Sequence, residues 1–289
     1  MDKYYNIAGF LICVTGEKAE AIQRVCSFEP FEVKPGKPYF TFYLTHKTNK
    51  ELLVEEESAL HYRIDFENIV GHFVRLQNDI YQLTIMSPED DKPLFLNYRL
   101  GCRECILGGL MKPDLLQFAL WAAFGMLIAG QAIVIYASVI VFDNKAIVFL
   151  ADSDTVKSTH THLWLKHIPG STLLTDNGFI ILRDSSTPYI CGSPWSKNTP
   201  CFQNKCIPLA GIVHLSQASH NQMYRLWMLE AVSAILPSCP SVFAEDKELS
   251  RHTCDTISEV LNFVPVWQLE CLPDEEAVRL LYTTVFPKI

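Results

Sequence analysis

The strongest constraint on the fold is an uncharged stretch that runs from Leu115 to Phe142. It is long enough to cross a bilayer as a single helix, because about 20 apolar residues suffice. Its composition changes in the middle, however, since residues 115–128 are rich in Leu, Ala and Phe and residues 132–141 in Ile and Val. Gly130 lies between the two parts. The stretch therefore predicts a buried helix, a glycine break and a buried strand rather than a membrane span.

The composition of the whole chain favours a folded protein without a nucleic-acid partner. Hydrophobic residues make up 49% of the chain and charged residues 19%, which supplies a core and argues against disorder. The net charge of −8 and the isoelectric point near 5.6 disfavour a nucleic-acid interface, which needs a basic surface. The length of 289 residues allows one large domain or two ordinary ones.

Ten cysteines are spread over the chain, and its first five residues lack the basic start and apolar core of a secretion signal. We therefore expect a cytoplasmic protein with reduced, mostly buried thiols. Cys102 and Cys105 have the spacing of zinc ligands, but one such pair does not make a complete site. Cys201 and Cys206 could complete it only if the fold brought them close.

Two regions with different patterns divide the chain near residues 108–114. The first region, residues 1–110, predicts a mostly antiparallel β domain with a short helix near residues 17–25. Its clearest element is a hairpin, formed by residues 69–76 and 80–85 around a turn.

The second region, residues 111–289, alternates β-branched strands with helices. The predicted fold class is therefore α/β, or α+β for the chain as a whole. Thr256 and Glu259 have the spacing of a capping box, which predicts that a helix begins there. Pro273 is expected at the first position of the final helix, with acidic residues in the first turn.

The segment from Ala146 to His167, AIVFLADSDTVKSTHTHLWLKH, predicts a strand, a loop and then a helix that begins near Ser158. A phosphate-binding P-loop places G-x-x-x-x-G-K-[ST] between a strand and a helix. Lys157 and Ser158 supply the last two positions of this motif. The two motif glycines are replaced, so the motif alone is incomplete.

The surrounding residues resemble a bacterial family related to HPr kinase and phosphoenolpyruvate carboxykinase. The stretch from Lys157 to Leu165 is similar to the P-loop helix of that family. Four further segments resemble it in the same order: Leu174–Asn177, Gly192–Ser196, Gly211–Ala218 and Leu272–Ala277. The resemblance covers roughly residues 130–285.

This resemblance implies a central mixed sheet, flanked by helices, with the P-loop at the end of a strand. It also implies phosphoryl transfer from ATP or diphosphate to a serine or small acid, and a homo-oligomeric assembly. Lys157, Ser158 and Thr159 would then bind the nucleotide phosphates, and Ser158 would hold Mg²⁺. Asp176 would act as general base or as a second Mg²⁺ ligand.

The loop departs from the family where phosphate would bind. Ala151, Asp154 and Val156 stand where the family has glycines, which allow the backbone to approach phosphate. A β-branched valine would be strained at a position that requires a positive φ angle. The carboxylates of Asp152 and Asp154 would each oppose a phosphate charge by about 3 kcal/mol at ~5 Å.

Other family positions differ in the same direction. Asn177 replaces the second acid of an Asp-Asp pair, and His214 replaces an arginine. Tyr136 stands where relatives often have histidine, and Lys197-Asn198 where they have Gly-Lys. Together these changes indicate a site that has lost catalysis.

The leading hypothesis is therefore a non-catalytic pseudokinase that acts as a binding or regulatory module. The alternative is an active ATP-dependent phosphotransferase with a variant loop and an unidentified phosphoacceptor protein. A third hypothesis assigns partner binding to residues 1–110. Structural explanations remain for single residues: Lys157 as a solvated residue at a helix start, Ser158 and Thr159 as caps, and Asp176 as a turn residue. His160 and His167 share a helical face but make a poor metal site without further ligands.

Overall fold

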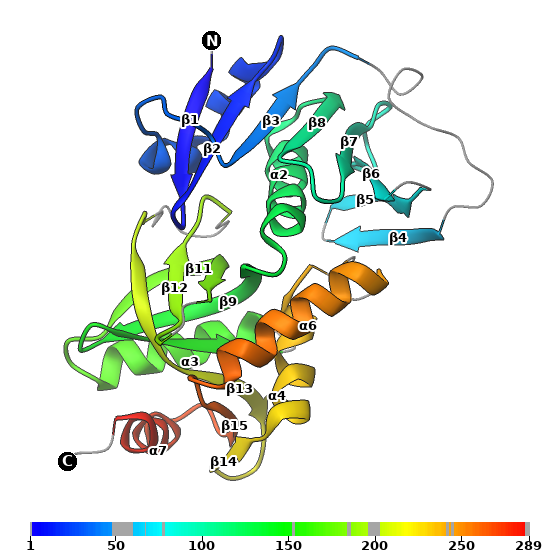
Figure 1. Ribbon diagram of the computed structural model, residues 1–289. Coiled ribbons are helices and arrows are strands. Elements are labelled where there is room, and N and C mark those ends of the chain that lie inside the picture. The colour runs from blue at the N-terminus through cyan, green and yellow to red at the C-terminus, as the bar shows by residue number, and fades with distance from the viewer. Residues whose placement is uncertain are drawn as a thin grey trace. The chain divides into compact units, whose positions relative to one another are not determined.

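The computed structural model describes residues 2–47, 60–66, 68–76, 79–151, 154–183, 186–195, 203–240, 243 and 246–286. The chain forms two compact units (Figure 1). Unit 1 comprises Met1–Ala129 and Pro240–Ser250, and unit 2 comprises Gly130–Cys239 and Arg251–Ile289. The first boundary between the units lies after Ala129, at the end of the long apolar helix, because that helix packs on strands of unit 1.

Unit 1 is built on an eight-stranded sheet in the order β1-β2-β3-β8-β7-β6-β5-β4. The strands are β1 (Lys3–Ile7), β2 (Phe10–Thr15), β3 (Phe40–Leu44), β4 (Leu60–Phe66), β5 (Ile69–Arg75), β6 (Ile80–Met86), β7 (Leu94–Arg99) and β8 (Glu104–Gly109). The predicted hairpin is confirmed as β5 and β6. The antiparallel prediction is wrong at β3, which pairs in parallel with both β2 and β8. The predicted early helix is instead a pair of 3₁₀ helices, η1 (Ala19–Arg24) and η2 (Cys26–Phe31).

The uncharged stretch folds as predicted into a helix, a glycine and a strand. Helix α2 (Pro113–Ile128) has buried residues along its length and contacts β6 and β7. Gly130 has a φ angle of 86°, a left-handed conformation that ends helices and favours glycine. The strand β9 (Ala132–Phe142) follows. Within the part of the chain that the structure describes, no helix has both the length and the apolar character needed to cross a lipid bilayer.

Unit 2 has a seven-stranded sheet in the order β10-β9-β11-β12-β13-β15-β14, with β10 also paired to β13. After β9 its strands are β10 (Lys145–Leu150), β11 (Thr172–Leu182), β12 (Tyr189–Gly192), β13 (Cys206–Gln217), β14 (Gln222–Leu226) and β15 (Val266–Cys271). Its helices are α3 (Asp154–His167), α4 (Met228–Ile235), η4 (Leu236–Ser238), α6 (Lys247–Leu261) and α7 (Glu275–Val285). Helix α6 is shared, because its residues up to Ser250 belong to unit 1 and those from Arg251 onward to unit 2. The two sheets and their helices confirm the α+β class.

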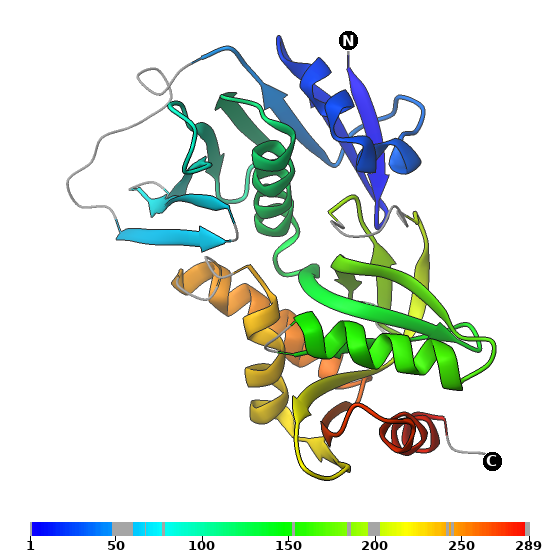
Figure 2. The ribbon, with the colours of Figure 1, turned by 180° about the vertical axis from the view of Figure 1, so that it is seen from behind.

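Helices cover both faces of the unit 2 sheet (Figure 2). Residues of α4 and α6, such as Ile235 and Ile257, share a core with one face of the sheet. Trp164 of α3 and Leu281 of α7 share a second core with the other face. This two-sided burial explains why β9 and β10 are almost entirely apolar.

Two predicted helix starts are wrong. Helix α6 begins at Lys247, so Thr256 lies inside it, where its hydroxyl donates to the carbonyl of His252 at 2.8 Å. Helix α7 begins at Glu275 with Asp274 as its N-cap, whose side chain accepts from the Ala277 amide at 3.0 Å. A side chain that can cap a helix can equally bond to the preceding turn, and sequence spacing does not distinguish the two.

A disulfide joins Cys191 to Cys206, which corrects the prediction that all thiols are reduced. The two residues lie directly opposite each other in the antiparallel β12–β13 ladder, with Cα atoms 4.0 Å apart. Of the seven free cysteines that the structure describes, four are buried, as predicted for most of them.

The second segment of unit 1, Pro240–Ser250, is held by the buried carboxylate of Asp246, which is 1% exposed. It accepts a hydrogen bond from the Tyr81 hydroxyl at 2.9 Å and pairs with the Arg75 guanidinium at 3.4 Å. It also accepts from the amides of Glu248 and Leu249 at 3.0 Å each, and so caps the start of α6. Burial and this contact raise the pKa of Tyr81, so its hydroxyl remains a donor.

We predict that Asp246→Ala lowers the free energy of unfolding by about 3 kcal/mol, because it leaves a buried hydroxyl without its acceptor and removes a helix cap. Urea unfolding followed by circular dichroism measures this change. The matched control is Asp255→Ala on the same helix, whose exposed pair with Arg251 should cost less than about 0.5 kcal/mol. Equal effects of the two substitutions would contradict the prediction.

We also predict that peptide mapping without reductant recovers the peptides of Cys191 and Cys206 as one linked species. Reduction should lower the free energy of unfolding by about 3 kcal/mol, since the bridge closes a loop with a sequence separation of 15. Cys254→Ser should leave the linked species intact, because Cys254 is free. Recovery of the two peptides unlinked would refute the bridge.

Candidate functional site

The candidate site lies in unit 2 at the carboxyl ends of three parallel strands, β10, β13 and β15. These strands end at Leu150, Gln217 and Cys271, and α3 begins nearby at Asp154. Open α/β sheets bind ligands at this kind of position, outside the carboxyl ends of their strands.

Helix α3 begins one turn earlier than the predicted start at Ser158. Val156 therefore lies in helical backbone and is not among the residues with a positive φ angle, so the strain expected from a P-loop conformation is avoided. Only about the first turn of an α-helix leaves its amides free. With this start, residues 154–157 form the first turn, and the amides of Ser158 and Thr159, which the motif places at the helix start, lie in the second turn, where intrahelical bonds occupy them.

Lys157 is buried, with 4% of its surface exposed, so it is not the solvated residue that a helix start would suggest. Its ammonium nitrogen lies 4.6 Å from the centroid of the Tyr136 ring on β9. This distance fits a cation–π interaction, which is stronger when the pair is desolvated. The positive charge expected to meet phosphate is held against an aromatic face.

Ser158 and Thr159 are exposed in the second turn of α3, and they do not cap it because the helix has already begun. The Ser158 carbonyl accepts from the Thr161 hydroxyl at 3.0 Å. Asp176 lies within β11 rather than at the strand end predicted at residue 175. Its backbone pairs with Ser138 of β9, which is long enough to continue the ladder as far as Leu182.

The segment after β12 lies against β11. Ser193 donates its hydroxyl to the Gly178 carbonyl at 2.7 Å and accepts from the Trp195 amide at 3.3 Å. A Cβ atom on Gly178 would come within 2.9 Å of the Cβ atom of Trp195, so only glycine fits there without rearrangement. Lys197-Asn198, Asp152 and Cys201 lie outside the described residues.

His214, which the resemblance aligns with an arginine of the HPr kinase-like family, lies in β13 and bonds to the amide side chain of Gln268. Its Nδ1 atom is 2.9 Å from Oε1 of Gln268, and the Gln268 amide donates to the Ser216 hydroxyl at 2.8 Å. A histidine in a row of amide and hydroxyl groups supplies no fixed cation for phosphate.

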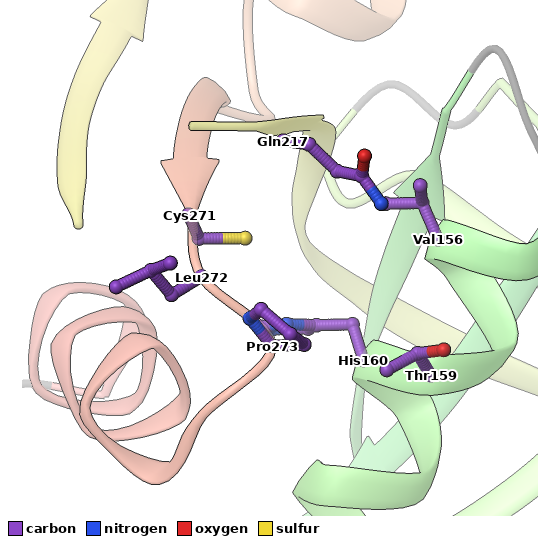
Figure 3. A pocket seen from close by; sticks show the side chains of 7 residues that line it. All are labelled: Val156, Thr159, His160, Gln217, Cys271, Leu272 and Pro273. Atoms are coloured by element: carbon purple, nitrogen blue, oxygen red, sulfur yellow. The ribbon is translucent and has the colours of Figure 1, made fainter. Parts of the chain in front are cut away.

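Beside these residues is a cavity of about 180 Å³ (Figure 3). It is lined by residues of α3 and of the ends of β13 and β15: Val156, Thr159, His160, Gln217, Cys271, Leu272 and Pro273. In Figure 3, His160 extends from α3 toward the Cys271–Pro273 segment, and Gln217 extends toward Val156.

His160 is 3% exposed, and its ring packs edge to face against the Phe149 ring, with 5.3 Å between the ring centroids. Its Nε2 atom has no hydrogen-bond partner among the residues that the structure describes. Burial lowers the pKa of His160 to about 4, against a smaller opposing effect of Asp274. Burial also raises the pKa of the Cys271 thiol to about 11. Both groups are therefore uncharged at neutral pH.

His160 and His167 were predicted to share one helical face, and the cavity was not predicted. The structure separates the two histidines, because His167 pairs with Glu275 at 3.2 Å. The available signal was the spacing of Val156, His160 and Trp164, which places them on one face of a helix. Only the fold shows that this face meets a cavity at its first two positions and the core at the third.

No group of three or more metal-binding side chains occurs among the described residues. Cys102 is exposed whereas Cys105 is fully buried in unit 1, and burial raises the pKa of the Cys105 thiol. A buried thiol that keeps its proton is a poor zinc ligand, because the thiolate is the form that binds metal.

No protein-family model matches the chain, and no curated protein is similar to it. The relation to HPr kinases therefore rests on the short segments described above, and it stays a prediction.

We predict that His160 makes stability fall in acid. Between its ordinary pKa of 6.5 and about 4, the unfolded chain binds a proton that the folded imidazole does not, so stability is lost as pH falls through this window. From pH 7 to pH 4.5 the loss amounts to roughly 2 kcal/mol. Urea unfolding of wild type and His160→Leu at both pH values measures it, and the variant should lack this part of the loss.

The control for this experiment is His162→Leu, which changes an exposed histidine on the same helix. It should retain the acid sensitivity of the wild type. An identical pH dependence of wild type and His160→Leu would show that His160 is not buried in neutral form.

Proposed function

We propose that the protein is a non-catalytic relative of the HPr kinase-like P-loop proteins, a pseudokinase that acts as a binding or regulatory module. The observation that carries this proposal is the contact between Lys157 and Tyr136. To reach a phosphate, the ammonium would have to leave the aromatic ring and a site where it is almost fully buried. Each such contact contributes about 1–2 kcal/mol when desolvated.

Two further observations support loss of phosphate binding. Val156 is helical, so the backbone does not offer the glycine-rich turn whose amides bind phosphate. His214 is paired with a neutral amide and replaces the family's fixed cation. These changes act on separate elements, α3 and β13, and all weaken binding of an anion at the same end of the sheet.

An active phosphotransferase is the second candidate, because Ser158 is exposed beside Lys157, where a P-loop serine would bind Mg²⁺. It would rely on Lys157, Ser158 and Asp176, with ATP and Mg²⁺ as cofactors. The two candidates differ in whether Mg-ATP binds at all.

We predict that calorimetric titration with ATP or ADP, with and without Mg²⁺, gives no binding at about 1 mM nucleotide, which corresponds to a binding free energy weaker than about −4 kcal/mol. Micromolar binding that requires Mg²⁺ and disappears in Lys157→Ala would overturn the proposal and favour the phosphotransferase. Lys166→Ala, an exposed lysine on the same helix, is the control and should behave as wild type.

A further inference from the structure

We propose that the cavity beside His160 binds a small uncharged amide. The ligand's amide would bond to His160 Nε2 and to the Gln217 side chain, and its hydrocarbon part would contact Val156, Leu272 and Pro273. This inference goes beyond the proposed function, because it assigns a ligand site that does not depend on whether nucleotide binds.

The first observation is the unsatisfied Nε2 atom of His160. Buried polar atoms in folded proteins almost always have a hydrogen-bond partner, because an unmade bond leaves the cost of desolvation uncompensated. Nε2 has none among the described residues, and the side chain that carries it lines the cavity. A residue that lowers stability in this way is typical of a site kept for binding.

The second observation concerns charge: among the described residues that line the cavity, none supplies a counter-charge for an ionic ligand. His160 and Cys271 are uncharged at neutral pH, so neither attracts an anion. The nearby Asp274 carboxylate would repel an anion, and it already accepts from the Ala277 amide and from Asn221 at 3.1 Å. A cation would lose its hydration among largely apolar walls, at a cost that an occupied carboxylate does not offset.

An amide fits His160 and Gln217, and the hydroxyl of Thr159 is a further polar group on the cavity wall. A neutral imidazole presents Nε2 either as donor or as acceptor, depending on its tautomer, and an amide can meet both forms. Gln217, at the carboxyl end of β13, is itself an amide and can pair with another through one N–H and one C=O. The volume of about 180 Å³ corresponds to roughly six water molecules at liquid density, so a ring-sized ligand fits.

The test uses benzamide as the probe and benzoate as its charged counterpart of the same shape. Titrations of the full-length protein are followed by the ¹⁵N resonance of His160 Nε2 and by calorimetry. Benzamide should shift the Nε2 resonance and bind at least tenfold more tightly than benzoate. His160→Leu should weaken benzamide binding at least tenfold, whereas His162→Leu should not change it.

Gln217→Leu provides a second variant on the surface of the protein, where folding is not at risk. It should weaken benzamide binding several-fold. Three results would overturn the proposal: no benzamide binding at about 20 mM, roughly twenty times a dissociation constant of 1 mM; equal binding of benzoate; or unchanged binding in both His160→Leu and Gln217→Leu. The first result would mean that water alone occupies the cavity.

Lys157→Ala keeps this test separate from the nucleotide experiment. Benzamide binding should persist in this variant, because Lys157 does not line the cavity. Loss of benzamide binding in Lys157→Ala alone would assign the ligand to the P-loop region and would overturn the proposal.

Discussion

The buried carboxylate of Asp246 is the interaction on which unit 1 depends most. It joins a strand residue, Tyr81, to a chain segment 165 residues later, and it also starts helix α6. A carboxylate this deeply buried is stable only when donors surround it, and here a hydroxyl, a guanidinium and two amides do so. The same atoms that anchor the returning segment therefore fix where a helix of the second half begins. One residue thus ties the second segment of unit 1 to Tyr81 and caps the start of α6.

At the carboxyl end of the unit 2 sheet, the groups that could attract an anion are engaged or uncharged. Lys157 is held by Tyr136, His214 is bonded to an amide, and His160 is kept neutral by burial. A P-loop site combines free amides with free cations to select phosphate. In this chain Lys157 and His214 are engaged and His160 is uncharged, so the region suits neutral polar molecules better than anions. The proposed pseudokinase and the proposed amide site are two consequences of that arrangement.

Local patterns in the sequence were sufficient for elements that local forces determine. The transition at Gly130 and the hairpin of β5 and β6 follow from periodicity and turn chemistry, and both are confirmed. The helix start predicted at Thr256 is wrong because a threonine hydroxyl bonds within a helix as readily as at its start. The extra turn of α3, the disulfide of Cys191 and the cavity at His160 depend on which strands become neighbours. That information lies in long-range packing, which a single sequence does not display.

The chain order of the two units has a consequence for how the protein is made. Residues 130–239 interrupt unit 1, so the ribosome completes most of unit 2 before it reaches the segment that completes unit 1. At about 5–20 residues per second, the first 129 residues wait roughly ten seconds for Asp246 to emerge. During that interval the hydroxyl of Tyr81 lacks its acceptor. Unit 1 thus lacks its second segment through much of synthesis, although its eight strands lie within residues 3–109, and its final stability is reached only after the body of unit 2 has left the ribosome.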